Sequence, residues 1–218
     1  MNRSLSGFDP IPQHRGLWSA QKGTLRCTAL QLRDGSLCLY SPVLGLGDAA
    51  RTSLAKLGKV AFLLAPNHYH NKGLSEYAKA FAGAALVCSE RARPRLEQQT
   101  GLSFEGLQPL NDLLPDGAKI LEPQGLKTGE VWLTRVTSED TVWVVCDAFK
   151  GPSGKEGDIS TQIELLGTFP TYGIEDKGTY SAFVKSTLTD LPPTTIVPCH
   201  GSIVRSDHLA ADIASLTG

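Results

Sequence analysis

Residues 60–74 read VAFLLAPNHYHNKGL, an apolar run followed at once by a segment that carries two histidines. The run over residues 60–65 is short, wholly apolar and bounded by turn-forming residues, which is typical of a strand buried on both faces of a sheet. His68 and His70 stand two positions apart, so their side chains point to the same side if the segment is extended. The stretch therefore predicts a buried strand that ends in two aligned imidazoles.

Strands and helices are expected in both directions from this stretch. Asp34-Gly35 separates two alternating runs, which is a strong signal for a hairpin. Asp48 is expected to cap a helix that Gly58 ends. That helix is expected to cover residues 49–57, and the strand described above covers 60–65. A helix over 74–81, a strand over 85–89 and a basic helix over 90–99 complete the first half.

The second half, like the first, begins with strands and ends with a helix. Its runs of β-branched and aromatic residues predict strands, and its later segments have helical patterns. The expected strands cover residues 118–121, 130–137, 141–146 and 194–198, and the expected helices cover 158–169, 178–188 and 206–216. Because no low-complexity linker separates the halves, we expect one α/β domain spanning residues 1–218.

The composition limits the classes of partner. Of the 218 residues 41% are hydrophobic and 20% are charged, which is typical of a globular protein with a sizeable core. The net charge of -1 provides no field that would attract nucleic acid or an anionic membrane, and no apolar run is long enough to span a bilayer. Without an apolar signal segment, we expect a cytoplasmic protein whose five scattered cysteines are reduced. The oligomeric state is left open.

Polar residues of metal-binding types directly follow three of the expected strands. His68 and His70 follow residues 60–65, Asp147 follows 141–146, and His200 follows 194–198. In α/β proteins ligands gather at the carboxyl ends of strands, and imidazole with carboxylate suits zinc, iron or manganese. A single histidine at a strand end is usually an ordinary loop residue, but the ordered set of four is far more specific. The set predicts a site for one divalent metal ion.

This order of motifs resembles the metallo-β-lactamase superfamily from about Thr24 to Gly218. VVCDAF (residues 144–149) is similar to the family's bridging aspartate motif at Asp147, and VPCHGS (197–202) to its final histidine motif at His200. GSLCLYSP (35–42) and LGKVAFLLAPN (57–67) resemble a divergent subgroup with a degraded metal motif. The resemblance implies an αββα sandwich, in which helices flank two mixed sheets and a one- or two-metal site lies at the strand ends.

The family's His-x-His-x-Asp-His signature can be aligned with this sequence in two registers. The preferred register places Gly73 on the glycine that follows the signature, which aligns the strand and the next helix without a gap. In that register the four signature positions are occupied, in order, by Pro66, His68, His70 and Asn71.

The other register begins the signature at His68, so that Lys72 and Gly73 occupy its Asp and last His positions. In both registers Leu126 stands where the family has a further metal-binding histidine. Leucine cannot bind metal, so a two-metal centre is not expected. The ligand set that the resemblance and the spacing leave is His68, His70, Asp147 and His200.

Two functions are compatible with this set. The first is a metal-dependent hydrolase with a single zinc, iron or manganese ion, acting on a small ester, thioester, lactone or phosphoester. The alternative is a non-catalytic protein without metal. Such a protein would use the cleft of the decayed metal site to bind a small molecule, or use the fold to bind a partner. No catalytic residue is assigned, because the signature's water-activating aspartate is replaced by His70 or Lys72. Cys146 and Cys199 are expected to be small buried hydrophobes.

Overall fold

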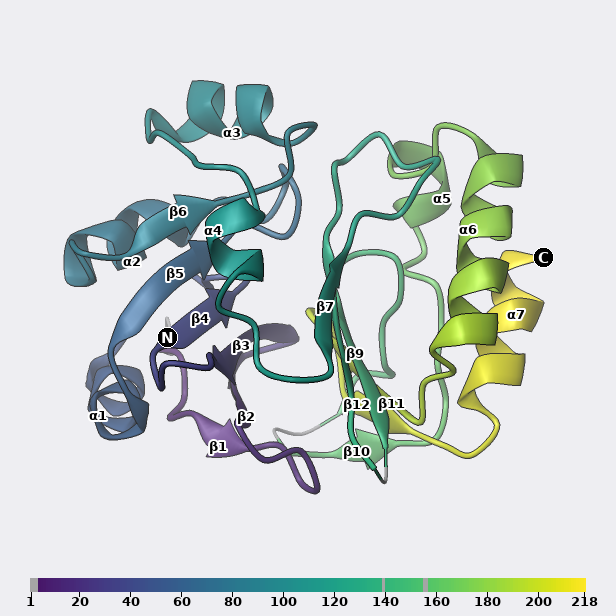
Figure 1. Ribbon diagram of the computed structural model, residues 1–218, viewed down its shortest axis with the longest axis horizontal. Helices are drawn as coiled ribbons and strands as arrows, with labels where there is room; N and C mark the ends of the chain where they lie inside the picture. Colours follow the sequence, from purple (N-terminus) through teal and green to yellow (C-terminus); the bar gives the residue numbers. More distant parts are fainter. Residues whose placement is uncertain (1–3, 139, 155–156) are drawn as a thin grey trace. The chain divides into compact units, whose positions relative to one another are not determined.

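The computed structural model describes residues 4–138, 140–154 and 157–218, and the chain divides into two compact units, Met1–Asp116 and Gly117–Gly218. Each unit contains one mixed sheet with its own helices and its own hydrophobic core (Figure 1). The assignment of residues 1–218 to one domain stays a prediction.

The sheet of the first unit has six described strands in the order β1-β2-β3-β4-β5-β6. Strands β1 to β4 are antiparallel, whereas β4, β5 and β6 run parallel. The expected hairpin at Asp34-Gly35 joins β3 to β4, with Gly35 at a φ of 82°. The strands are β1 (Asp9–Pro10), β2 (Leu17–Lys22), β3 (Leu25–Gln31), β4 (Leu37–Tyr40), β5 (Val60–Leu64) and β6 (Ala85–Val87).

The helices of the first unit pack their apolar side chains against this sheet. Ala50 and Leu54 of the first helix and Tyr77 of the second lie in one core cluster with the strand residues. Asp48 is not the cap that we expected: Gly47 is the N-cap, and Asp48 lies in the first turn, where its charge favours the positive end of the helix. The helices are α1 (Asp48–Leu57), α2 (Leu74–Ala80), α3 (Arg93–Thr100) and α4 (Gln108–Asn111).

The sheet of the second unit has six described strands in the order β10-β12-β11-β9-β8-β7. Strands β9 and β11 are adjacent and parallel, so their carboxyl ends lie at the same edge. The strands are β7 (Ala118–Leu121), β8 (Trp132–Val136), β9 (Thr141–Val145), β10 (Ile159–Ser160), β11 (Thr195–Pro198) and β12 (Ile203–Arg205). The helices are α5 (Phe169–Tyr172), α6 (Lys177–Asp190) and α7 (Leu209–Thr217).

The core of the second unit is centred on stacked aromatic rings. The indoles of Trp132 and Trp143 have ring centroids 5.4 Å apart, and both side chains are fully buried. Tyr180 and Val184 of α6 and Leu209 of α7 complete the same cluster, and Figure 1 shows these two helices along one face of the sheet.

The helix expected over residues 158–169 is wrong. Ile159 and Ser160 form β10, which pairs in parallel with β12, and helical structure begins only at Phe169. Glu164 instead exchanges two backbone hydrogen bonds with Lys150. The apolar spacing of this segment therefore reflects an extended chain whose Ile163 reaches the core, and its pairing partners lie far away in sequence.

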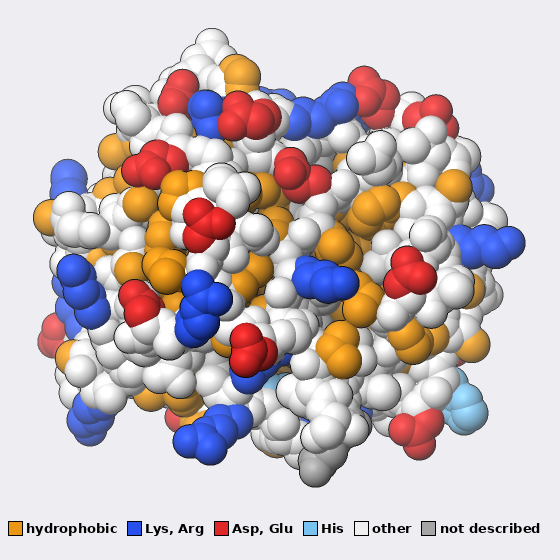
Figure 2. All heavy atoms as spheres, in the orientation of Figure 1, with side chains coloured by type: hydrophobic (Ala, Val, Ile, Leu, Met, Phe, Trp, Pro, Cys, Tyr) orange, Lys and Arg blue, Asp and Glu red, His pale blue; other side chains and the backbone are white. Residues whose placement is uncertain are grey.

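Acidic and basic side chains are interspersed on the face that Figure 2 shows, in agreement with the net charge of -1. Among the described residues, none of the helices has both the length and the apolar character that a bilayer crossing requires.

Gly201, next to His200, tests how tightly this part of the second unit is packed. Its φ is 79°, and a Cβ atom there would lie 2.1 Å from the carbonyl oxygen of Gly151. Gly157 has a similar φ of 84° but nothing within 4 Å of such an atom. We expect Gly201→Ala to lower the free energy of unfolding by at least about 3 kcal/mol, and Gly157→Ala by only about 1 kcal/mol. Urea titrations of both variants measure the difference, and equal losses would contradict the close approach.

Candidate metal centre

The ends of β9 and β11 bring two of the expected ligands together. Pro198 pairs with Val145 in the parallel ladder, and Asp147 and His200 each lie two residues beyond this pair. His200 Nε2 lies 2.9 Å from Asp147 Oδ1. The Asp147 side chain is 3% exposed and that of His200 is 21% exposed, so the pair is open to solvent on the imidazole side. Within the second unit, the prediction that Asp147 and His200 adjoin is confirmed.

A buried carboxylate, Glu130, holds the chain in place where β9 ends. Its oxygens accept hydrogen bonds from the backbone N–H groups of Cys146, Asp147 and Ala148 at 3.2, 3.1 and 3.2 Å. They also accept one from the indole of Trp132 at 2.8 Å. Backbone N–H groups that leave a sheet need new acceptors when they are buried, and one side chain supplies all three here. Glu130 therefore determines the backbone position from which the Asp147 side chain projects.

Asp147 lies close to two further acidic groups. Burial is the largest cause that raises the pKa of the Glu130 carboxyl group, and the neighbouring Asp147 carboxylate is the next. Burial, and next Asp147, which is its hydrogen-bond partner, also raises the pKa of the Tyr172 hydroxyl. Glu130, Cys146 and Asp147 could offer three ligand atoms within 4.8 Å of one another. Both Glu130 oxygens are already engaged by N–H donors, however, so Glu130 supports the site better than it could bind an ion.

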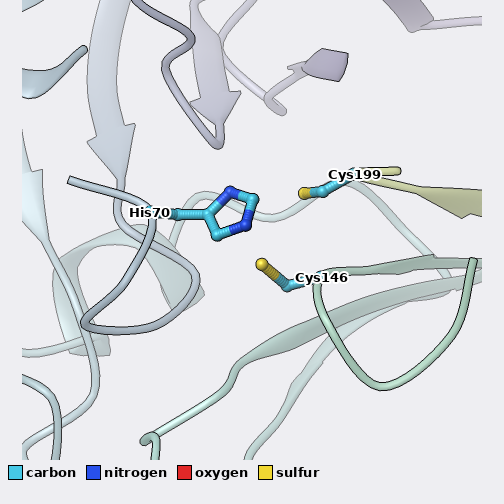
Figure 3. A group of neighbouring side chains, drawn as sticks. All are labelled: His70, Cys146 and Cys199. Atoms are coloured by element: carbon cyan, nitrogen blue, oxygen red, sulfur yellow. The ribbon is translucent and has the colours of Figure 1, made fainter. Parts of the chain in front are cut away.

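Cys146 and Cys199 follow β9 and β11 directly, and Figure 3 labels both side chains. Both thiols are buried, as expected from the sequence. They are hydrogen-bond partners, and burial with this contact raises the pKa of Cys146 well above its ordinary value.

In the first unit, Ser41 orients His70. Ser41 Oγ lies 2.8 Å from His70 Nδ1, and the serine is 1% exposed. Ser41 directly follows β4 and has a φ of 58°, a left-handed conformation that is costly for a residue other than glycine. Its backbone N–H bonds to Leu64 at the end of β5, which holds it there. A partner on Nδ1 fixes the ring and its tautomer, which is the usual support for a histidine that binds metal through Nε2.

The loop that carries both histidines is held by Asn67, whose side chain is completely buried. Its Oδ1 accepts hydrogen bonds from the backbone N–H groups of Tyr69 and His70 at 2.8 and 3.1 Å. This is an Asx turn, in which a side-chain amide replaces a backbone acceptor. The turn, not an extended segment, determines where the two imidazoles point.

His68 has a different environment from His70. Its Nε2 lies 3.3 Å from the guanidinium of Arg95, which also stacks over the Tyr69 ring at 4.7 Å from the centroid. Because a guanidinium only donates, Nε2 of His68 is the acceptor in this bond. A metal ion at this nitrogen would have to displace Arg95. The role of His68 as a ligand, like the complete set of four, stays a prediction.

Leu126 has the environment that its sequence position implies. It is 2% exposed and belongs to the core cluster of the second unit, among aromatic and aliphatic side chains. A hydrocarbon core therefore fills the place where the resemblance implies a lost histidine.

Sequence reasoning did not identify Glu130, Ser41 or Tyr172. Glu130 begins the run EVWL, where an acidic residue could equally mark an exposed strand end. Ser41 lies in a Ser-Pro turn whose positive φ is not encoded in the residue type. Tyr172 lies in the short helix α5, which begins at Phe169, the last residue of the helix that was expected over 158–169.

Replacing Glu130 tests its supporting role. Glu130→Ala would leave three backbone N–H groups and one indole N–H without their acceptor, so we expect the free energy of unfolding to fall by about 3 to 5 kcal/mol. The control is Glu164→Ala, which removes a surface ion pair with Lys150 and should cost less than about 1 kcal/mol. Denaturant titrations of both variants measure this, and a small loss in Glu130→Ala would show that the hydrogen bonds contribute little.

Two substitutions of Ser41 separate strain from hydrogen bonding. Ser41→Gly removes the bond to His70 but relieves the left-handed strain, so its stability should stay within about 1 kcal/mol of the parent. Ser41→Ala loses the bond and keeps the strain, so it should lose about 1 to 3 kcal/mol. Both variants should change the nitrogen-15 chemical shifts of the His70 ring. Unchanged shifts would contradict the orienting role, and a glycine variant less stable than the alanine variant would contradict the strain.

Comparisons with known proteins show which fold this is. No protein-family model and no curated protein matches the sequence. Among solved structures, the chain is similar to a metallo-β-lactamase from Hirschia baltica, with a TM-score of 0.66 and 12% identity, covering 99% of this chain and 98% of that chain. It is also similar to the metallo-β-lactamase FIM-1 from Pseudomonas aeruginosa in its mono-zinc form, with a TM-score of 0.64 and 14% identity, covering 99% and 96%.

A third similar structure is the metal-soaked Flv1 flavodiiron core from Synechocystis sp. PCC6803, with a TM-score of 0.63 and 12% identity. The match covers 99% of this chain and 62% of that one. Identities this low establish the fold and not the activity. The two mixed six-stranded sheets and the coverage of nearly the whole chain confirm the fold class expected from the sequence. The chain therefore has the metallo-β-lactamase fold.

Proposed function

We propose that the chain binds one divalent metal ion and hydrolyses a small ester, thioester, lactone or phosphoester. The observation that carries this proposal is the pair formed by Asp147 and His200, a carboxylate oxygen and an imidazole nitrogen 2.9 Å apart at adjoining strand ends. Both residues lie two positions beyond the ends of adjacent strands, which is a placement that suits ligands to a metal.

The donor types fit a divalent ion. Carboxylate oxygen and imidazole nitrogen suit zinc, iron and manganese. The pKa of Glu130 is raised partly by the Asp147 carboxylate, and a cation bound to Asp147 would offset this repulsion. A bound metal ion would supply Lewis-acid polarisation of the substrate and a lower pKa for its water ligand.

A single ion is proposed because Leu126 stands where the resemblance implies a further metal-binding histidine. Leu126 is a core residue, so the position supplies hydrocarbon instead of imidazole. A mono-zinc form of a protein with this fold, FIM-1, offers a precedent for one ion. The sequence resemblance adds His70 and His68 as the remaining proposed ligands, and the Ser41 bond to His70 is the kind of support that such a ligand receives.

The substrate is proposed to be a small molecule, since the net charge of -1 would not attract nucleic acid or an anionic membrane. Tyr172 is the second-unit group best suited to contact it. The hydroxyl of Tyr172 is a hydrogen-bond partner of Asp147, and burial together with the Asp147 carboxylate raises its pKa. If a metal ion engaged the Asp147 carboxylate, the single O–H of Tyr172 would be available to donate a hydrogen bond to a substrate oxygen beside it.

A second candidate function is small-molecule binding without catalysis. It is favoured by the bond between His68 and Arg95, which occupies the imidazole nitrogen and places a cation beside a proposed ligand. It is favoured also by the replacement of the signature's acidic residue, which would otherwise activate water, by His70 or Lys72.

Metal addition separates the two candidates. The core clusters of both units consist of apolar and aromatic side chains, so chelator-treated protein should stay folded. Zinc or manganese at about 100 times its dissociation constant should add about 2.7 kcal/mol, which raises the melting temperature by several degrees. The loaded protein should also hydrolyse at least one member of a panel of ester, thioester, lactone and phosphoester substrates.

His200→Ala should abolish both the thermal shift and the hydrolysis, whereas the control His208→Ala, at an exposed position, should retain both. If metal raises the melting temperature but no metal-loaded form hydrolyses a substrate, the protein binds metal without catalysis, which favours the second candidate. No shift with any divalent metal would refute the proposed site.

A further inference from the structure

The thiols of Cys146 and Cys199 form a buried pair at the ends of two adjacent strands. Each residue directly follows its strand, and Cys199 N donates to Val145 O at 3.0 Å, so the parallel ladder continues to this pair. The two sulfur atoms lie within 4.8 Å of each other and are hydrogen-bond partners. Figure 3 shows the two cysteine side chains, which follow β9 and β11.

The spacing of the parallel ladder is compatible with a disulfide between the two cysteines. Neighbouring strands in a sheet are about 4.8 Å apart, and paired residues project to the same face. Disulfides span Cα separations of about 4.4 to 6.8 Å, so the ladder spacing falls inside this range. With the two sulfur atoms already within 4.8 Å of each other, a change of side-chain torsion is the movement that we expect to bring them together.

We propose that Cys146 and Cys199 are an oxidation site that forms a reversible cross-strand disulfide on reaction with hydrogen peroxide. In the first step one cysteine sulfur attacks a peroxide oxygen: an S–O bond forms, the O–O bond breaks, and the leaving oxygen takes the thiol proton as water. In the second step the other sulfur attacks the sulfenic sulfur: the S–S bond forms, the S–O bond breaks, and a second water leaves. The two thiols lose two electrons, and one hydrogen peroxide is reduced.

Burial limits the first step but favours the second. Both thiols are at most 2% exposed, so only an oxidant about the size of water is expected to reach them, and slowly. Once one sulfur is oxidised, the other is already in contact with it, and the intramolecular step outpaces further oxidation. The outcome should therefore be a disulfide and not a sulfinic acid.

The disulfide would join the two strand ends that carry Asp147 and His200, each of which is the next residue in the chain. Because side-chain rotation is the movement that we expect, the hydrogen bond between Asp147 and His200 can persist. The inference depends on the positions of the two thiols alone and holds whether or not the protein binds metal.

Peroxide treatment of the folded, metal-free parent protein tests this inference. After treatment the remaining thiols are alkylated in denaturant, and peptides are mapped by mass spectrometry. We expect a linked peptide pair containing Cys146 and Cys199, a loss of two hydrogen atoms, and full reversal by dithiothreitol. The oxidised parent should melt several degrees above the reduced parent, because the cross-link restricts the unfolded chain.

Three variants sharpen the result. Cys146→Ala and Cys199→Ala should each lose the cross-link and the thermal shift, and the remaining cysteine of the pair should be overoxidised or stay alkylatable. Cys88→Ala, at a buried cysteine of the first unit, should behave like the parent. Sulfinic acid at either position of the parent without a linked peptide would overturn the inference, as would two thiols that remain fully alkylatable after prolonged treatment.

Discussion

The carboxylate of Glu130 is the constraint on which the candidate centre depends. Strand β9 ends at Val145, and the next three backbone N–H groups leave the ladder inside the protein, where water cannot serve them. One side chain accepts all three and takes a fourth bond from the Trp132 indole, which is itself stacked in the core. The packed indole of Trp132 therefore positions the Glu130 carboxylate, and this carboxylate in turn positions the backbone of Asp147.

The same principle operates separately in the first unit. The imidazoles of the loop after β5 are placed by side chains that bond to backbone or ring nitrogen: Asn67 forms the turn and Ser41 holds His70. Ser41 does so from a left-handed conformation, which means that the surrounding structure offsets a local cost to keep a hydroxyl at this point. Each unit thus supports its candidate ligands with side chains whose polar atoms are already engaged in hydrogen bonds.

Much of the fold could be predicted from local signals. The Asp34-Gly35 turn, the apolar run before His68 and the strand before Asp147 are each determined by patterns a few residues long, and the structure confirms them. The rule that ligands gather at strand ends also correctly paired Asp147 with His200, because β9 and β11 are parallel neighbours.

What failed depends on contacts between distant segments. The segment before Phe169 has apolar residues at a spacing that suits a helix, but β12, about 45 residues away, pairs with it as a strand. The burial of Glu130 and the φ of Ser41 likewise arise from tertiary contacts, which the residue type alone does not predict. His68 shows the same limit, since the proximity of Arg95 arises from how α3 packs within the first unit.

The central claim is that Asp147 and His200 are metal ligands and not merely a hydrogen-bonded pair. The most direct measurement is anomalous X-ray diffraction at the zinc absorption edge from crystals of the zinc-loaded protein. The claim requires one strong anomalous peak per chain, about 2.0 to 2.2 Å from a carboxylate oxygen of Asp147 and a ring nitrogen of His200. A crystal grown in excess zinc with no peak at this position, and with the 2.9 Å contact between the two side chains intact, would contradict it.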